Sequence, residues 1–168
     1  MSTCPHCNKT IVHPSGYRES KILIIRDEPY KTEYSDYKRP RFSPHSTPKS
    51  ILADEMFRLG VDFSQVRLAN LWQHVPNKKE ECFHEMKKSL FAETRGKKAI
   101  LLAGADVVKF FTGYNVSEIS GLQVESNKLS APIVFASVDP TTAMSRGMGE
   151  IRFSIENFVN KMIEEDVL

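Results

Sequence analysis

The chain has 168 residues, of which 40% are hydrophobic and 26% are charged, a mixture that predicts one globular domain over residues 1–168. No apolar run is long enough to span a bilayer, and the polar start of the chain has no signal-peptide core, so we expect an intracellular protein with no membrane partner. The formal net charge of +2 is too small to indicate a nucleic-acid partner by itself.

The N-terminus, residues 1–20, carries a pair of potential metal ligands. Cys4 and Cys7 are two residues apart, a spacing at which two thiolates bind one metal ion. With Cys82 the chain has three cysteines, and an odd number in an intracellular chain argues against a disulfide framework. The pair is half of a site, and three reduced cysteines without a metal are the alternative.

Short apolar runs alternate with helix-like segments along the rest of the chain. Runs of this length suit strands that are buried on both faces. Strands that alternate with helices predict βαβ units, an α/β fold and a mostly parallel sheet. The expected strands are 22–25, 66–71, 99–103 and 133–136, and the expected helices are 48–59, 79–95, 106–111 and 151–163.

A long polar segment, 30–47, follows the first predicted strand. A loop of this length in a compact domain is usually functional or disordered, and ligands of open α/β sheets bind at the carboxyl ends of strands. Lys38, Arg39 and Arg41 lie among aromatic residues there, which makes this segment a stronger candidate for nucleic-acid contact than the other basic clusters; a solvated surface is the alternative.

Polar residues also follow three of the predicted strands. Asp27 and Glu28 come after the first strand, and paired carboxylates can orient or activate water. Asn70 lies near the end of the second predicted strand, and its amide can both donate to and accept from the edge of a pyrimidine. Asp139 follows the fourth strand. Ordinary turn or cap residues are the alternative at each of these positions.

Taken in order, these segments resemble the uracil-DNA glycosylase superfamily, most closely its iron–sulfur branch. Segment 22–30 stands where that branch has a strand and Gly-Glu-Ala-Pro-Gly, although its Pro-Tyr end is more similar to the Gly-Gln-Asp-Pro-Tyr of the classical branch. Segment 39–42 looks like Gly-Arg-Pro-Phe with one extra residue. Segment 69–70 looks like Thr-Asn, and segment 139–141 stands where the family has His-Pro-Ser.

The resemblance implies a three-layer αβα sandwich around a four-stranded sheet, with DNA as the partner. It also implies hydrolysis of the N-glycosidic bond of uracil or another deaminated base, flipped out of the duplex. Glu28 or Asp27 would position water, Tyr30 would exclude the thymine methyl group, and Phe42 would stack on the base. Asn70 would read the edge of the base, and Met144 and Arg146 follow the position from which the family wedges into the duplex.

Departures from the motifs affect the expected activity. The family's histidine stabilises negative charge on the leaving uracil, whereas an ionised Asp139 would repel it; one such donor contributes roughly 10²–10³ in rate. Arg26 and Tyr30 also replace glycines. We therefore expect reduced or absent uracil excision, or a different base. A non-catalytic accessory subunit of a replication or repair complex is the second hypothesis, and a zinc-stapled module that binds a nucleotide or a protein is the third.

The same resemblance completes the metal site. It implies that His74 and Cys82 join Cys4 and Cys7, with His6, His13 and His84 as competing ligands. Three thiolates and one imidazole are typical of structural zinc, which is favoured, and a [4Fe-4S] cluster is the alternative. The metal would attach the N-terminal arm to the 70–82 loop.

Overall fold

The computed structural model describes residues 3–29, 48–74 and 80–168, with the exception of the Met144 side chain. Its centre is a sheet of four parallel strands in the order β2-β1-β3-β4. The α/β class and the parallel sheet predicted from the sequence are thereby confirmed. The strands are β1 (Ile22–Arg26), β2 (Val66–Asn70), β3 (Ala99–Ala103) and β4 (Ile133–Ser137).

The strands end level with one another at one edge of the sheet. Arg26, the last residue of β1, pairs with Asn70 of β2 on one side and with Ala103 of β3 on the other. Ala103 in turn pairs with Ser137, the last residue of β4. Because all four strands are parallel, the segments that follow them emerge at this same carboxyl edge.

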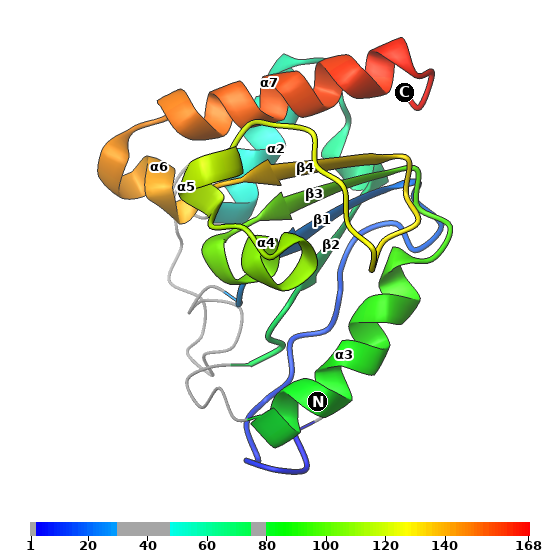
Figure 1. Ribbon diagram of the computed structural model, residues 1–168, viewed down its shortest axis with the longest axis vertical. Helices are drawn as coiled ribbons and strands as arrows, with labels where there is room; N and C mark the ends of the chain where they lie inside the picture. The colour runs from blue at the N-terminus through cyan, green and yellow to red at the C-terminus, as the bar shows by residue number, and fades with distance from the viewer. Residues whose placement is uncertain (1–2, 30–47, 75–79) are drawn as a thin grey trace.

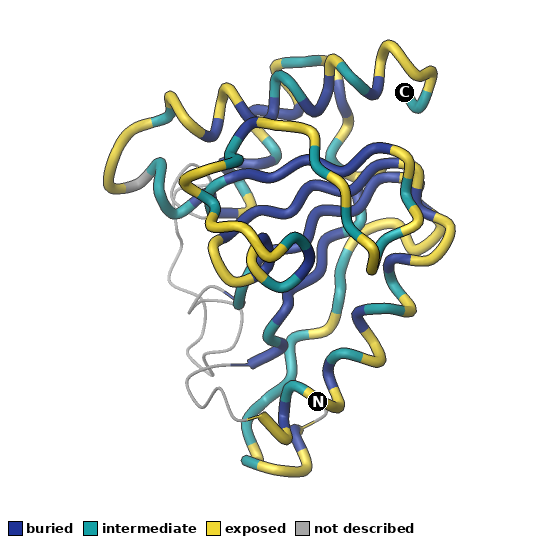
Figure 2. Tube along the Cα trace, viewed as in Figure 1, coloured by how far each residue is buried: buried dark blue, intermediate teal, exposed yellow. Residues whose placement is uncertain are grey.

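Helices cover both faces of the sheet and form the outer layers of an αβα sandwich (Figure 1). On one face, Ile22 and Ile24 pack with apolar residues of α2 and α7; on the other, Leu23 and Ile25 pack with residues of α3 and α4. The strands are almost entirely buried between these layers, as Figure 2 shows. These helices are α2 (Pro48–Arg58), α3 (Glu80–Thr94), α4 (Ala105–Thr112) and α7 (Gly149–Glu164).

Three shorter elements were not predicted from the sequence. They are η2 (Phe63–Gln65), α5 (Val116–Ile119) and α6 (Thr141–Arg146). Each is too short to show a helical period of apolar residues. Of the three, α6 follows β4 at the carboxyl edge of the sheet and therefore contributes to the candidate site.

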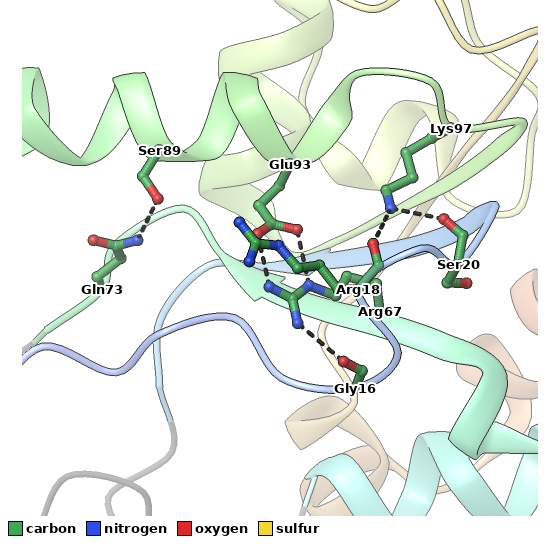
Figure 3. A network of polar contacts seen from close by, with 8 residues as sticks. All are labelled: Gly16, Arg18, Ser20, Arg67, Gln73, Ser89, Glu93 and Lys97. Carbon is green, nitrogen blue, oxygen red and sulfur yellow. Dashed lines mark hydrogen bonds and ion pairs between the residues drawn. The ribbon is translucent and has the colours of Figure 1, made fainter.

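The N-terminal arm, described from residue 3 to residue 20, runs beside α3 and β2 (Figure 1). A polar network fixes its second half to the sheet (Figure 3). Arg67 of β2 makes two hydrogen bonds of 2.9 and 2.8 Å to Glu93 of α3 and donates a third to the Gly16 carbonyl. The buried ammonium of Lys97 donates to the Ser20 carbonyl at 2.7 Å. The arm is therefore an integral part of the described fold.

In the described part of the chain, none of the helices combines the length and the apolar composition needed to cross a bilayer.

Candidate functional site

The three cysteines and His74 form one compact group. The Sγ atoms of Cys4, Cys7 and Cys82 and a ring nitrogen of His74 all lie within 4.8 Å of one another. His74 Nε2 is 3.3 Å from Cys7 Sγ, and Cys4, Cys82 and His74 are buried. The predicted set of four is therefore brought together, and His6, His13 and His84 are not members of the group in the described structure.

Three local structures present the four side chains of this group. Cys4 and Cys7 lie in a tight turn closed by hydrogen bonds from Asn8 N–H to the Cys4 carbonyl and from Cys4 N–H to the Lys9 carbonyl, both 2.8 Å long. His74 lies four residues beyond the end of β2, and Cys82 lies in the first turn of α3. The group therefore joins the arm, the segment after β2 and the start of α3.

The chemistry of these side chains fits a bound cation. Burial raises the pKa of the Cys82 thiol, and the neighbouring Cys4 and Cys7 thiols raise it further. Burial alone would also raise the pKa of Cys4, but the His6 and Cys7 amides and the other two thiols lower it overall. Burial lowers the pKa of His74, which keeps the imidazole neutral as metal ligation requires. Three crowded thiols can all become thiolates only if a cation compensates their charge.

A second group of predicted residues gathers at the carboxyl edge of the sheet. Asp27, directly after β1, accepts a 2.8 Å hydrogen bond from the Val107 amide in the first turn of α4. Its carboxylate lies against Gly104, where an added Cβ would come within 2.4 Å of Asp27 Cγ. Burial raises the pKa of Asp27 to about 6, and the charges of Asp106 and Asp139 add to the rise. Asp27 is therefore mostly ionised at neutral pH and is able to take up a proton.

Asp139 is paired with Arg26. Arg26 Nε lies 3.4 Å from Asp139 Oδ2, and Arg26 Nη2 donates to Asp139 Oδ1 at the same distance. Asp139 Oδ1 also accepts a 2.9 Å hydrogen bond from the Thr141 amide at the start of α6. The two side chains are only 3% and 17% exposed, so this is a largely buried ion pair. Arg26 and Asp139 are two separate departures from the family motifs in the sequence, and in the fold they are in contact.

Asn70 ends β2 beside Arg26 and is 8% exposed. Its Oδ1 atom is buried and has no hydrogen-bond partner in the described part of the chain. A buried amide oxygen without a partner costs free energy, roughly 1–3 kcal/mol. Among the described residues, the Asn70 side chain is therefore a buried acceptor whose hydrogen-bonding capacity is not met.

A cavity of about 330 Å³ opens beside these carboxylates. Asp27 and Asp139 line it, together with Thr141, Thr142, Ser145 and Arg146 of α6. This volume falls at the lower end of the range for small-ligand sites, about 300–1,000 Å³. Two predicted catalytic residues and one predicted DNA contact thus share one cavity. The hydroxyl groups of α6 were missed as lining residues because so short a helix has no sequence pattern.

Other predicted residues have different outcomes. Glu28 follows Asp27 and is half-buried, but it is not among the residues that line this cavity. Met144 lies within α6, and its side chain is outside the description. The remaining predicted positions lie outside the described residues: Tyr30, Lys38, Arg39, Arg41 and Phe42.

The chain matches no protein-family model, and a search of curated proteins finds no significant match either. The resemblance to the glycosylase superfamily therefore depends on the sequence motifs alone.

Proposed function

We propose that this chain is a DNA-binding protein of the uracil-DNA glycosylase superfamily, with a metal-stapled N-terminal arm and a modified base pocket at the carboxyl edge of the sheet. In this proposal, Asp27 or Glu28 positions water, Asn70 reads the base, and the segment 30–47 supplies the stacking and phosphate contacts. The activity is excision of a deaminated base by N-glycosidic hydrolysis, at a reduced rate.

The observation that carries the proposal is the Cys4, Cys7, His74 and Cys82 group. The motif resemblance picks these four residues from three separate parts of the sequence, and their ligand atoms lie within 4.8 Å of one another. The strand order and the level carboxyl ends support the same assignment, because they bring Asp27, Asn70 and Asp139 to one edge.

The compactness of the group favours one zinc ion over an iron–sulfur cluster. At a Zn–S distance of about 2.3 Å, tetrahedral ligand atoms lie roughly 3.8 Å apart. The ligands of a [4Fe-4S] cluster bind different irons and would lie roughly 6 Å apart. A separation of at most 4.8 Å is closer to the first arrangement. Zinc would hold the three thiolates and the imidazole together and would serve as a structural staple.

The Arg26–Asp139 pair suggests how catalysis is reduced. The family has glycine and histidine at these two positions, and here a cation and an anion replace them together and lie 3.4 Å apart. Replacing Asp139 alone with histidine would leave the buried Arg26 without this partner, and breaking a buried pair in this way is strongly destabilising. Restoring the family's arrangement therefore requires both substitutions.

A single-turnover excision assay on uracil-containing DNA tests the proposal. We expect the wild type to bind DNA and to excise uracil weakly or not at all, and Arg26→Gly combined with Asp139→His to excise at least tenfold faster. Asp139→His alone is the matched control and should gain little. Asp27→Asn and Glu28→Gln in the double variant then identify which carboxylate acts on water.

Two results would separate the competing functions. Tight DNA binding with no excision by any variant would favour the non-catalytic accessory subunit, for which the Arg26–Asp139 pair already gives a reason. If the chain binds neither single- nor double-stranded DNA at low salt, the DNA-binding proposal is wrong. Lys38→Ala and Arg39→Ala should each reduce the slope of log affinity against log salt by about one.

A further inference from the structure

Segment 71–74 connects the metal-ligand group to the carboxyl edge of the sheet. It begins directly after Asn70 and ends at His74. The Leu71 amide donates to the Arg26 carbonyl at 2.7 Å, and the Trp72 amide donates to the Asp27 carbonyl at 2.8 Å. These bonds continue the β1–β2 ladder past the last strand residues, so the segment supports the backbone that carries Arg26 and Asp27.

The other end of the segment is held by the arm and by α3. The Val12 amide donates to the Gln73 carbonyl at 2.8 Å, and the Gln73 amide lies 3.2 Å from the sulfur of Met86. The His74 ring is fully buried; its Nε2 lies 3.3 Å from Cys7 Sγ, and its Nδ1 has no partner in the described residues. A contact with a thiol is weak, so a bound ion would fix this ring much more firmly than the protein alone.

Trp72 lies between the two groups. Its ring packs against Phe83 with a centroid separation of 5.1 Å, and Phe83 follows the ligand Cys82 on α3. Trp72 also contacts both the core on the α3–α4 side of the sheet and the small cluster of Cys4, Cys82 and Met86. It is the single tryptophan of the chain, so its fluorescence reports on this junction alone.

We propose that segment 71–74 couples metal binding to the rigidity of the backbone at the carboxyl edge of the sheet, with His74 as the positioning residue. Zinc bound to His74 fixes the end of the segment, and the segment then fixes the Arg26 and Asp27 backbone and the position of Asn70. Coupling of this kind is reciprocal, so a ligand that orders the edge also tightens zinc binding. The inference rests on the proposed metal centre and does not depend on whether the edge binds DNA.

The test is amide hydrogen exchange of the full chain, measured by NMR with zinc and after its removal by a chelator. The expected result is exchange at least tenfold slower for the Leu71 and Trp72 amides when one zinc is bound, together with a change in Trp72 fluorescence. Amides of Phe158 and Val159 in α7 lie in the core on the opposite face of the sheet, so they report the general stabilisation of the fold by zinc and serve as the internal reference.

Substitution of His74 locates the coupling. His74→Ala should still bind zinc, more weakly, through the three cysteines, but zinc should no longer slow the Leu71 and Trp72 amides. His74→Cys keeps a ligand on the segment and should keep the slowing, and it serves if the alanine variant does not fold.

Two outcomes overturn the inference in different ways. If one zinc binds to the wild type and the Leu71 and Trp72 amides do not respond, the coupling is wrong and the metal centre stands. If zinc does not bind, both the metal centre and the coupling are wrong, whatever the DNA assays give.

Discussion

Asp27 combines a structural contact with a perturbed carboxyl group. Its Oδ1 accepts from the Val107 amide, and burial raises its pKa to about 6 from an ordinary value of 3.8. A carboxyl whose pKa is higher in the folded state binds more protons there than in the unfolded chain. Its contribution to stability is therefore most favourable below pH 4 and is lost as the pH rises through 6.

Asp27→Asn tests this sign at the residue scale. The asparagine oxygen can still accept from Val107, but it carries no charge, so the variant should be more stable than the wild type above pH 6, by at most about 3 kcal/mol. Urea unfolding between pH 4 and pH 8 measures the difference, which should grow from pH 4 to pH 6 and then stay constant. Asp106→Asn removes a charge that raises the pKa of Asp27 and should move the same transition to lower pH. A difference that is independent of pH would contradict the assigned pKa.

At the scale of elements, the turn between β3 and α4 contacts the Asp27 carboxylate. Gly104 has φ 153° and ψ 159°, a conformation that is essentially restricted to glycine. An added Cβ would also come within 2.4 Å of the Asp27 carboxylate. The turn therefore permits the close approach of β1 and α4 that places the carboxylate at the cavity.

Gly104→Ala should lower the free energy of unfolding by about 2–4 kcal/mol, since backbone strain and the clash with Asp27 add together. Gly113→Ala is the matched control: its φ is 79°, nothing lies within 4 Å of an added Cβ, and it should lose about 1–2 kcal/mol through strain alone. Chemical denaturation measures both. In an Asp27→Ala background, the loss of unfolding free energy caused by Gly104→Ala should fall toward that of the control. An equal loss in both backgrounds would show that the Asp27 carboxylate does not lie against Gly104.

At the scale of the whole molecule, the sequence is most informative where one physical rule dominates. The strands are continuous apolar runs, so their number, order along the chain and parallel arrangement follow from burial on both faces. The Cys4–Cys7 spacing indicates metal binding, but only the family resemblance adds His74 and Cys82. The Arg26–Asp139 pair could not be predicted, because its partners are 113 residues apart and depend on where the segment after β4 turns. The short helix α6, whose hydroxyl groups line the cavity, has no periodic pattern to read.

A metal ion bound by Cys4, Cys7, His74 and Cys82 would also affect the stability of the whole molecule, since these residues join the arm, the segment after β2 and α3. Zinc that binds only the folded chain stabilises it by about 2.7 kcal/mol at a free concentration of 100 times its Kd. For a domain of this size, that corresponds to a Tm higher by roughly 5–10 °C.

Calorimetry with zinc and with a chelator measures the shift, and metal analysis of the purified protein should find one zinc per chain and no iron. Cys82→Ser removes one buried ligand and should reduce the Tm shift caused by the chelator, whereas His84→Ala, on the same helix but outside the group, should leave the full shift. If the purified protein is brown and contains iron, the group holds an iron–sulfur cluster and not zinc. If the chelator does not change the Tm of the wild type, the four side chains pack together without a metal.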